Sequence, residues 1–210
     1  MNHTIVDFSD NIEKLAHKYN PSYIKTIDII ASGGGIAGIY TSGFYGYLYQ
    51  LIKDNKIKLD KIYGTSSSAL SSSFFLVTLY LLQYPEYFDK YPTINNNAID
   101  HIYRVSSAHK YDIKLVTEYE KILYEILPPD FYKYCTDKLF ITVTLCSYIN
   151  VERKIIHKYY SNTHLINTIM SSCSISYLTI PSIFNKYHCL DTNNIYNAYD
   201  GISVMIPKKY

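Results

Sequence analysis

The sequence predicts an α/β protein with a mostly parallel central sheet, and three observations lead to this class. Short apolar runs rich in β-branched residues alternate with longer segments of helical spacing. Two consecutive strand-to-helix junctions carry tight turns, at 33–38 and at 64–68. The chain has 210 residues, of which 48% are hydrophobic, and this suffices for one core, so a single domain over 1–210 is expected.

Apolar residues at three- and four-residue steps are expected in helices, and short runs of β-branched and aromatic residues in strands. The expected helices are 11–19, 39–53, 67–82, 115–127 and 165–172. The expected strands are 26–31, 57–63, 139–149 and 152–160, the last two joined by a turn at Asn150, with a final extended stretch at 196–205. The strand at 26–31 and the helix at 67–82 are almost wholly apolar, which predicts that both are buried. Residues 86–109 show no regular pattern and are expected to form a lid, an insertion or a mobile segment.

The composition narrows the classes of function. The net charge is +2 and no block of basic residues occurs, so no nucleic-acid partner is expected. The four cysteines form no CxxC pair, so no metal site is expected, and they are interpreted as reduced thiols in a cytoplasmic protein. The first residues lack an apolar signal region, and the longest apolar stretch, 74–82, is far shorter than the roughly 20 residues that span a bilayer. Contact with a membrane is therefore expected to be peripheral and transient.

The first tight turn, GGGIAG at 33–38, has the pattern GxGxxG. Glycine permits the sharp turn of a chain that passes at once from a strand into a helix. The first N–H groups of the helix point outward and attract anionic oxygens. A plain turn without a ligand is the alternative. A dinucleotide site is not favoured, because it needs an acid at the end of the next strand, and Asp54 and Asp60 stand elsewhere.

The second tight turn, GTSSS at 64–68, is a degenerate GxSxG in which Ser68 replaces the last glycine. In such a turn the central serine, here Ser66, stands at a strained apex with its Oγ beside the outward N–H groups. An ordinary helix N-cap by Thr65 or Ser67 is the alternative. Because the two turns follow neighbouring strands, they are expected to face the same edge of the sheet. One turn would then supply a nucleophile and the other an oxyanion hole.

A serine nucleophile needs a proton acceptor nearby. Asp200-Gly201 stands at the end of an extended stretch, where the glycine allows the backbone to approach another element closely, and an Asp-Gly hairpin turn is the alternative. A conventional order of serine, aspartate and histidine could instead use Asp137 with His164 or His188. The histidines carry no local signature and are interpreted as surface or structural residues.

Four segments carry a resemblance to a known family: SGGGIAGIYTSGFYGYL, IYGTSSSAL, SSCSISYLTIP and AYDGISVMIP, in this order. They resemble the landmark segments of patatin-like phospholipases, which are related to cytosolic phospholipase A2, and the resemblance covers 26–207. It implies a three-layer α/β/α fold with a mostly parallel central sheet. It also implies hydrolysis of lipid or phospholipid acyl esters by a Ser–Asp dyad through an acyl-enzyme, without histidine, metal or cofactor.

Carried over by position, the resemblance implies that Ser66 is the nucleophile and Asp200 the proton acceptor. It places the oxyanion hole at Gly33, Gly34, Gly35, Gly38 and Ser67, and supporting motif positions at Gly64, Ser68 and Gly201.

Three positions depart from the family pattern. Ala37 stands where the family has Arg or Lys, Ser68 where the elbow has its second glycine, and Ile202 where the third motif ends in Gly or Ala. Two functions from different classes are compatible with this pattern. One is an active serine esterase, and the other is a catalytically impaired protein of the same fold that binds a lipid or a partner.

Overall fold

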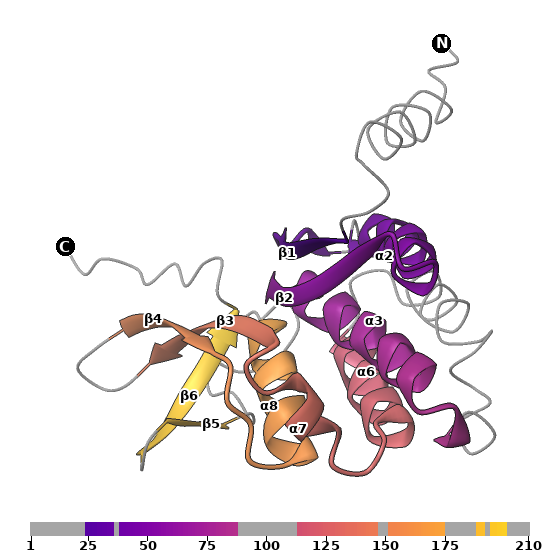
Figure 1. The fold of residues 1–210 in the computed structure, drawn as a ribbon. Coiled ribbons are helices and arrows are strands. Elements are labelled where there is room, and N and C mark those ends of the chain that lie inside the picture. Colours follow the sequence, from indigo (N-terminus) through magenta and orange to yellow (C-terminus); the bar gives the residue numbers. More distant parts are fainter. Residues whose placement is uncertain are drawn as a thin grey trace.

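The computed structural model describes residues 24–35, 38–87, 113–146, 151–174, 188–191 and 194–200, and these confirm the predicted α/β class (Figure 1). The strands are β1 (Lys25–Ala31), β2 (Ile57–Thr65), β3 (Leu139–Cys146), β4 (Val151–Ile156), β5 (His188–Asp191) and β6 (Asn194–Asp200). The helices are α2 (Gly38–Lys53), α3 (Ser67–Gln83), the 3-10 turn η2 (Pro85–Tyr87), α6 (Ile113–Ile126), α7 (Phe131–Cys135) and α8 (Asn162–Ser172). The helix expected at 11–19 lies outside the described residues, as does nearly all of the irregular segment expected at 86–109.

All six strands belong to one sheet. Its parallel part is β1, β2 and β3, in which β1 pairs with β2 and β2 pairs with β3. Its antiparallel part is formed by β4 and β6, which both pair with β3, and by β5, which pairs with β6. The predicted pairing of the strands on either side of Asn150 is confirmed as the β3–β4 pair. The sheet is therefore mixed, and its parallel part carries both tight turns.

Strand β3 organises the centre of this sheet. β4 pairs with β3 from Ile141 to Cys146 along one edge. Because a strand has only two edges, β2 and β6 share the other one. β2 pairs with the first half of β3 and β6 with the second half, so the carboxyl ends of β2 and β6 approach each other head to head.

The core lies between the sheet and one layer of helices. Helix α3 contacts both α2 and α8 as well as β2 and β3, so these three helices cover the same face (Figure 1). The predicted burial of the helix at 67–82 is confirmed, because α3 is buried on nearly every side from Ser68 to Leu81. The side chains of α8 that enter the core are fully buried: Leu165, Ile166, Ile169 and Met170.

The prediction that the strand at 26–31 is buried is wrong. In β1 only Ile29 is buried, whereas 84% of Ile30 is exposed. β1 is the edge strand of the sheet, and successive side chains alternate between its two faces, so Ile29 faces the helices while Ile30 faces away. The register shifts between Ile27 and Ile29, and there the carboxylate of Asp28 accepts a hydrogen bond from the N–H of Lys61 at 3.2 Å.

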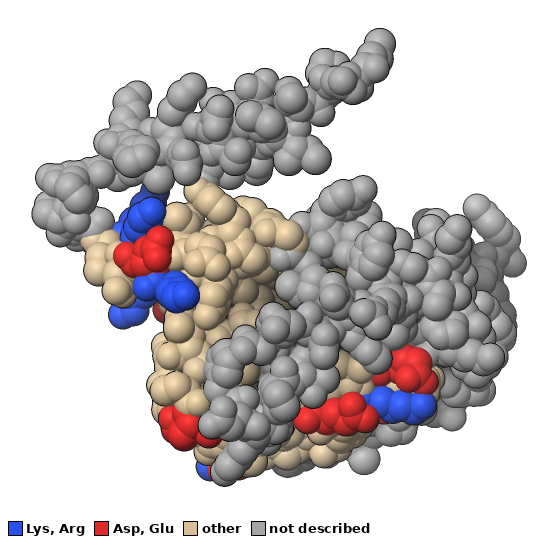
Figure 2. All heavy atoms as spheres, turned by 90° about the vertical axis from the view of Figure 1, so that its right-hand side faces the viewer, with Lys and Arg blue, Asp and Glu red and all other residues tan. Residues whose placement is uncertain are grey.

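Charges on the described surface are mixed in sign. Figure 2 shows basic and acidic side chains lying next to one another on one face of the molecule. Two exposed ion pairs also join side chains of opposite charge three residues apart. They are Lys121 with Glu118 at 2.7 Å and Lys133 with Asp130 at 2.8 Å. Within the described part of the chain, no helix combines the length and the apolar character needed to cross a membrane.

Candidate active site

The turn between β2 and α3 forms a sharp elbow with Ser66 at its apex. Ser66 has φ 58° and ψ −134°, a conformation that side-chain-bearing residues rarely adopt and that costs about 1–3 kcal/mol. Ser66 occupies the N-cap position of α3, yet its side chain makes no capping hydrogen bond. The residue is buried, with 7% of its surface exposed. The hydroxyl is thus held at a strained apex without a capping role.

The neighbouring glycine of the elbow has no room for a side chain. A Cβ added at Gly64 would lie 2.9 Å from the Cα of Ala69 and 3.1 Å from the carbonyl oxygen of Ser68. These contacts are with backbone atoms of α3, which cannot move independently of the helix. Gly64 therefore lets the start of α3 pack directly against the end of β2.

We expect Gly64→Ala to destabilise the fold by about 1–3 kcal/mol, as overpacking of a dense core does. Gly43→Ala is the matched control, because a Cβ at Gly43 in α2 meets no atom within 4 Å. That variant is expected to be neutral or to stabilise the chain by up to about 1 kcal/mol, since alanine favours helix. Urea unfolding of both variants measures the difference, and equal stabilities would contradict the packing described for Gly64.

The backbone of Ser66 is bonded to side chains at the end of α8. Its N–H donates to Ser172 Oγ at 2.8 Å, and its carbonyl oxygen accepts a hydrogen bond from Cys173 Sγ at 3.2 Å. The same carbonyl oxygen also accepts from the N–H of Ala69 at 2.9 Å, within the first turn of α3. Two elements far apart in the sequence therefore fix the elbow. Sequence patterns did not point to Ser172 or Cys173, although both stand in the third segment of the patatin resemblance.

The glycine turn lies beside the elbow, as predicted. Ala31 at the end of β1 pairs with Gly64, so the two turns leave the same edge of the sheet. Gly33 and Gly34 follow β1 directly, and Gly35 has φ 56°, which glycine adopts at little cost. Gly38 begins α2, whereas residues 36 and 37 lie outside the described part, and with them the departure at position 37.

Two side chains of the elbow bond to the end of β1 and to the glycine turn that follows it. Gly34 N–H donates to Ser67 Oγ at 3.2 Å. The hydroxyl of Ser68 lies 2.6 Å from the carbonyl oxygen of Ala31 and accepts from the N–H of Thr65 at 2.9 Å. Ser68 is fully buried, so the serine that replaces the second glycine of the elbow links the two turns through its hydroxyl.

Asp200 is the last residue of β6, and its backbone position is next to the elbow. Asp200 pairs with Val143 on the edge of β3 that β2 also uses. On that edge Thr65, which precedes Ser66, pairs with Thr142, the neighbour of Val143. Neighbouring strands lie about 4.8 Å apart and successive residues about 3.3 Å. The sheet thus brings the backbones of residues 66 and 200 close together, although the two residues lie far apart in the sequence. Gly201 and the departure at 202 lie outside the described residues.

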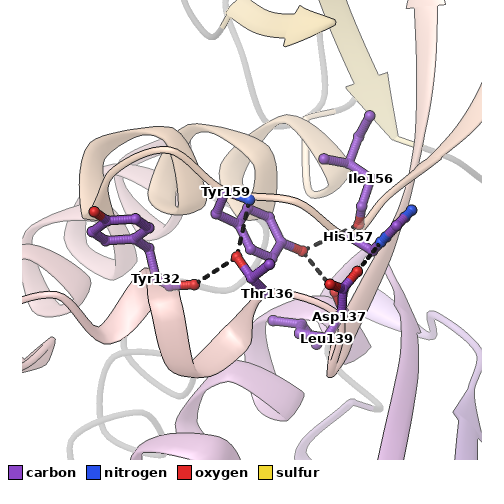
Figure 3. A network of polar contacts seen from close by, with 7 residues as sticks. All are labelled: Tyr132, Thr136, Asp137, Leu139, Ile156, His157 and Tyr159. Atoms are coloured by element: carbon purple, nitrogen blue, oxygen red, sulfur yellow. Dashed lines mark hydrogen bonds and ion pairs between the residues drawn. The ribbon is translucent and has the colours of Figure 1, made fainter.

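The alternative acid, Asp137, has a different partner (Figure 3). Asp137 Oδ1 lies 2.8 Å from His157 Nδ1, and the N–H of Asp137 donates to the carbonyl oxygen of His157 at 2.9 Å. Beside this pair, the N–H of Tyr159 donates to Thr136 Oγ1 at 3.2 Å and its hydroxyl donates to the carbonyl oxygen of Leu139 at 2.9 Å. The network fastens the turn before β3 to the segment after β4, which is a structural role.

His164 is buried in the first turn of α8. Its Nδ1 accepts a hydrogen bond from the N–H of Tyr160 at 3.3 Å, and its ring stacks on Tyr160 with the centroids 5.2 Å apart. Its Nε2 is buried and has no hydrogen-bond partner. Burial lowers the pKa of His164, because desolvation disfavours the charged imidazolium. His188 lies in β5, and only its backbone is described.

The lowered pKa of His164 predicts acid sensitivity of the fold. Below about pH 6.5 the unfolded chain binds a proton that the folded chain resists, so the free energy of unfolding falls as the pH falls. His164→Asn keeps a hydrogen-bond acceptor near Tyr160 but does not titrate. We expect urea unfolding between pH 7.5 and 5.5 to show a smaller loss of stability for this variant than for the wild type. Equal losses of unfolding free energy in the variant and the wild type would contradict a contribution of His164 to the acid sensitivity.

Within the described ranges, no group of three or more His, Cys, Asp or Glu side chains is arranged to hold a metal ion.

In the comparisons with known proteins, no family model matches this sequence and no curated protein matches it.

Proposed function

We propose that this chain is a patatin-like serine hydrolase that cleaves acyl esters of lipids through a Ser66–Asp200 dyad. The strongest support is the meeting of β2 and β6 on one edge of β3, where Thr65 pairs with Thr142 and Asp200 with Val143. Directly opposed residues of an antiparallel pair share a face of the sheet. Position 200 therefore lies on the same face as Val143, whose side chain is fully buried. The N–H of Ser66 donates to Ser172 at the end of α8, a helix that contacts β3.

In the proposed mechanism Ser66 Oγ attacks the ester carbonyl carbon while Asp200 accepts its proton. The carbonyl oxygen becomes an oxyanion, which is stabilised by the backbone N–H groups of Gly34 and Gly35 in the glycine turn and of Ser67 at the start of α3. The alcohol leaves with a proton returned from Asp200, and an acyl-enzyme remains on Ser66. Water then attacks the acyl carbonyl carbon while the same carboxylate accepts a proton from it. The bond from this carbon to Ser66 Oγ breaks, the fatty acid leaves, and Asp200 returns the proton to Oγ.

The geometry of the two turns supports this division of roles. The hydroxyl of Ser66 makes no capping hydrogen bond to α3, although Ser66 is the N-cap residue of this helix. Ser68 bonds to Ala31, the last residue of β1, so the strand that leads into the glycine turn stays at a fixed position relative to the elbow. Preorganised donors are the usual source of oxyanion stabilisation.

The lipid substrate and the three-layer architecture rest on the resemblance of the four segments to patatin-like phospholipases. The described helices form one layer, and Ile30 on the opposite face of the sheet is largely exposed. A second layer over the parallel part of the sheet belongs to the proposed architecture, since parallel strands are normally covered on both faces.

A purely binding role is the second candidate, and one contact favours it. Gly34 N–H, which would stabilise the oxyanion, already donates to Ser67 Oγ. If this bond persisted with a lipid bound, the fold would hold the lipid without cleaving it. In the catalytic alternative, rotation about the Cα–Cβ bond of Ser67 releases the N–H to the substrate.

Turnover assays distinguish the two candidates. We expect the 210-residue chain to hydrolyse p-nitrophenyl butyrate and to release fatty acid from phosphatidylcholine vesicles. Hydrolysis of the soluble ester alone would support the esterase activity but would exclude phosphatidylcholine as a substrate. Vesicle binding without release of fatty acid from either substrate would favour the binding role.

A further inference from the structure

The strained conformation of Ser66 depends on the end of α8. A residue in such a conformation keeps it only where the surrounding structure fixes it. The helix that follows Ser66 supplies one bond, from Ala69 N–H to the carbonyl oxygen of Ser66. The N–H of Ser66 finds its acceptor in Ser172, which is 106 residues away in the sequence. Without that hydroxyl, the N–H would be buried with no partner at this point.

Ser172 also bonds to the strand that carries the partner of Asp200. Its Oγ donates to the carbonyl oxygen of Thr142 at 2.8 Å. Thr142 precedes Val143, and Val143 pairs with Asp200. A single hydroxyl thus connects the backbone of Ser66 to the position in β3 next to that of Asp200.

The helix that presents Ser172 is well anchored. Ser161 Oγ caps α8 by accepting from His164 N–H at 3.0 Å. The apolar side of α8 is fully buried in the core, and Ser172 itself is 0% exposed. Its neighbour Cys173 adds the second contact, from Sγ to the carbonyl oxygen of Ser66. Groups presented by such a rigid element hold a site more accurately than groups on a loop.

We infer that Ser172 is a positioning residue that sets the direction of the Ser66 hydroxyl toward Asp200, with Cys173 as a second contact. This inference rests on the proposed dyad and adds to it a residue that touches neither the ester nor the transferred proton. Loss of the Ser172 hydroxyl lets the elbow relax and turns Ser66 Oγ away from the attacking position. The chemical step then slows, while the affinity for the ester is unchanged.

The test is the rate of covalent labelling by a fluorophosphonate, resolved into a binding constant and a maximal rate. We expect Ser172→Ala to lower the maximal rate about 10–100-fold, the cost of a misplacement near 1 Å, with the binding constant unchanged. Ser172→Cys keeps the shape of serine but is a weaker acceptor, so an intermediate rate is expected. Ser171→Ala is the matched control, because Ser171 is equally buried in α8 and its hydroxyl has no partner.

Amide exchange of Ser66 provides a readout that does not depend on activity. We expect its N–H to be protected in the wild type and in Ser171→Ala, and to exchange faster in Ser172→Ala. Wild-type labelling rates and wild-type exchange in Ser172→Ala would overturn the positioning role while leaving the dyad intact. A folded wild type that is not labelled at all would overturn the proposed function, and the positioning role with it.

Discussion

Ser66→Ala is expected to abolish ester hydrolysis while leaving the fold intact. The substitution removes the only atom that can form the acyl bond in the proposed mechanism, and loss of a serine nucleophile costs at least about 10³-fold in kcat. The hydroxyl makes no capping bond to α3, so its removal leaves no helix N–H unsatisfied. The strained backbone is held through the N–H and carbonyl groups of residue 66, which alanine retains. Turnover of p-nitrophenyl butyrate and urea unfolding, measured on the same preparation, test both expectations.

The control for this variant is Ser73→Ala. Ser73 lies in the same helix and is fully buried, and its hydroxyl donates to the carbonyl oxygen of Ala69 at 2.7 Å. It therefore tests the loss of a buried serine hydroxyl away from the elbow. We expect it to keep wild-type turnover. Turnover by Ser66→Ala close to that of Ser73→Ala would exclude Ser66 as the nucleophile.

Asp200→Asn is expected to lower kcat by about 10²–10⁴-fold, the usual contribution of a general base. The amide has the shape of the carboxylate but cannot accept the proton of Ser66. The backbone pairing of residue 200 with Val143 does not use the side chain, so the sheet is expected to be retained. The measurement is the steady-state rate with p-nitrophenyl butyrate, together with circular dichroism.

Two other aspartates provide controls. Asp191 is the last residue of β5 in the same hairpin, and Asp137 is the acid of the alternative triad, which pairs with His157. We expect Asp191→Asn and Asp137→Asn to retain activity. If Asp137→Asn were inactive and Asp200→Asn active, the dyad would be wrong and a histidine-dependent mechanism would replace it.

The elements with strong local patterns were predictable from the sequence. The apolar helix α3 and the strand β3 follow from continuous apolar runs, and the β3–β4 pair follows from the turn around Asn150. The missed elements are short. α7 has five residues, Phe131–Cys135, and β5 has four, His188–Asp191, so neither is long enough to show a period. Their conformation is set by tertiary contacts and by strand pairing.

The candidate site could be predicted only in part, because some of its contacts join residues that are far apart in the sequence. The two turns and the residues at their tips are local patterns of six residues or fewer, which the sequence displays directly. Ser172 and Ser66 are joined by a bond across 106 positions, and Gly34 and Ser67 by a bond across 33. No spacing rule connects such pairs, because their contact depends on how α8 and α3 pack against the sheet.

The most direct test of the dyad is to find which residue reacts. The 210-residue chain is treated with a fluorophosphonate, and the site of labelling is mapped by peptide mass spectrometry. We expect one phosphonyl group on the peptide that contains Ser66, with loss of ester hydrolysis in proportion to the labelling. A folded protein that hydrolyses the ester but carries the label on another residue, or one that stays unlabelled, would contradict a Ser66 nucleophile.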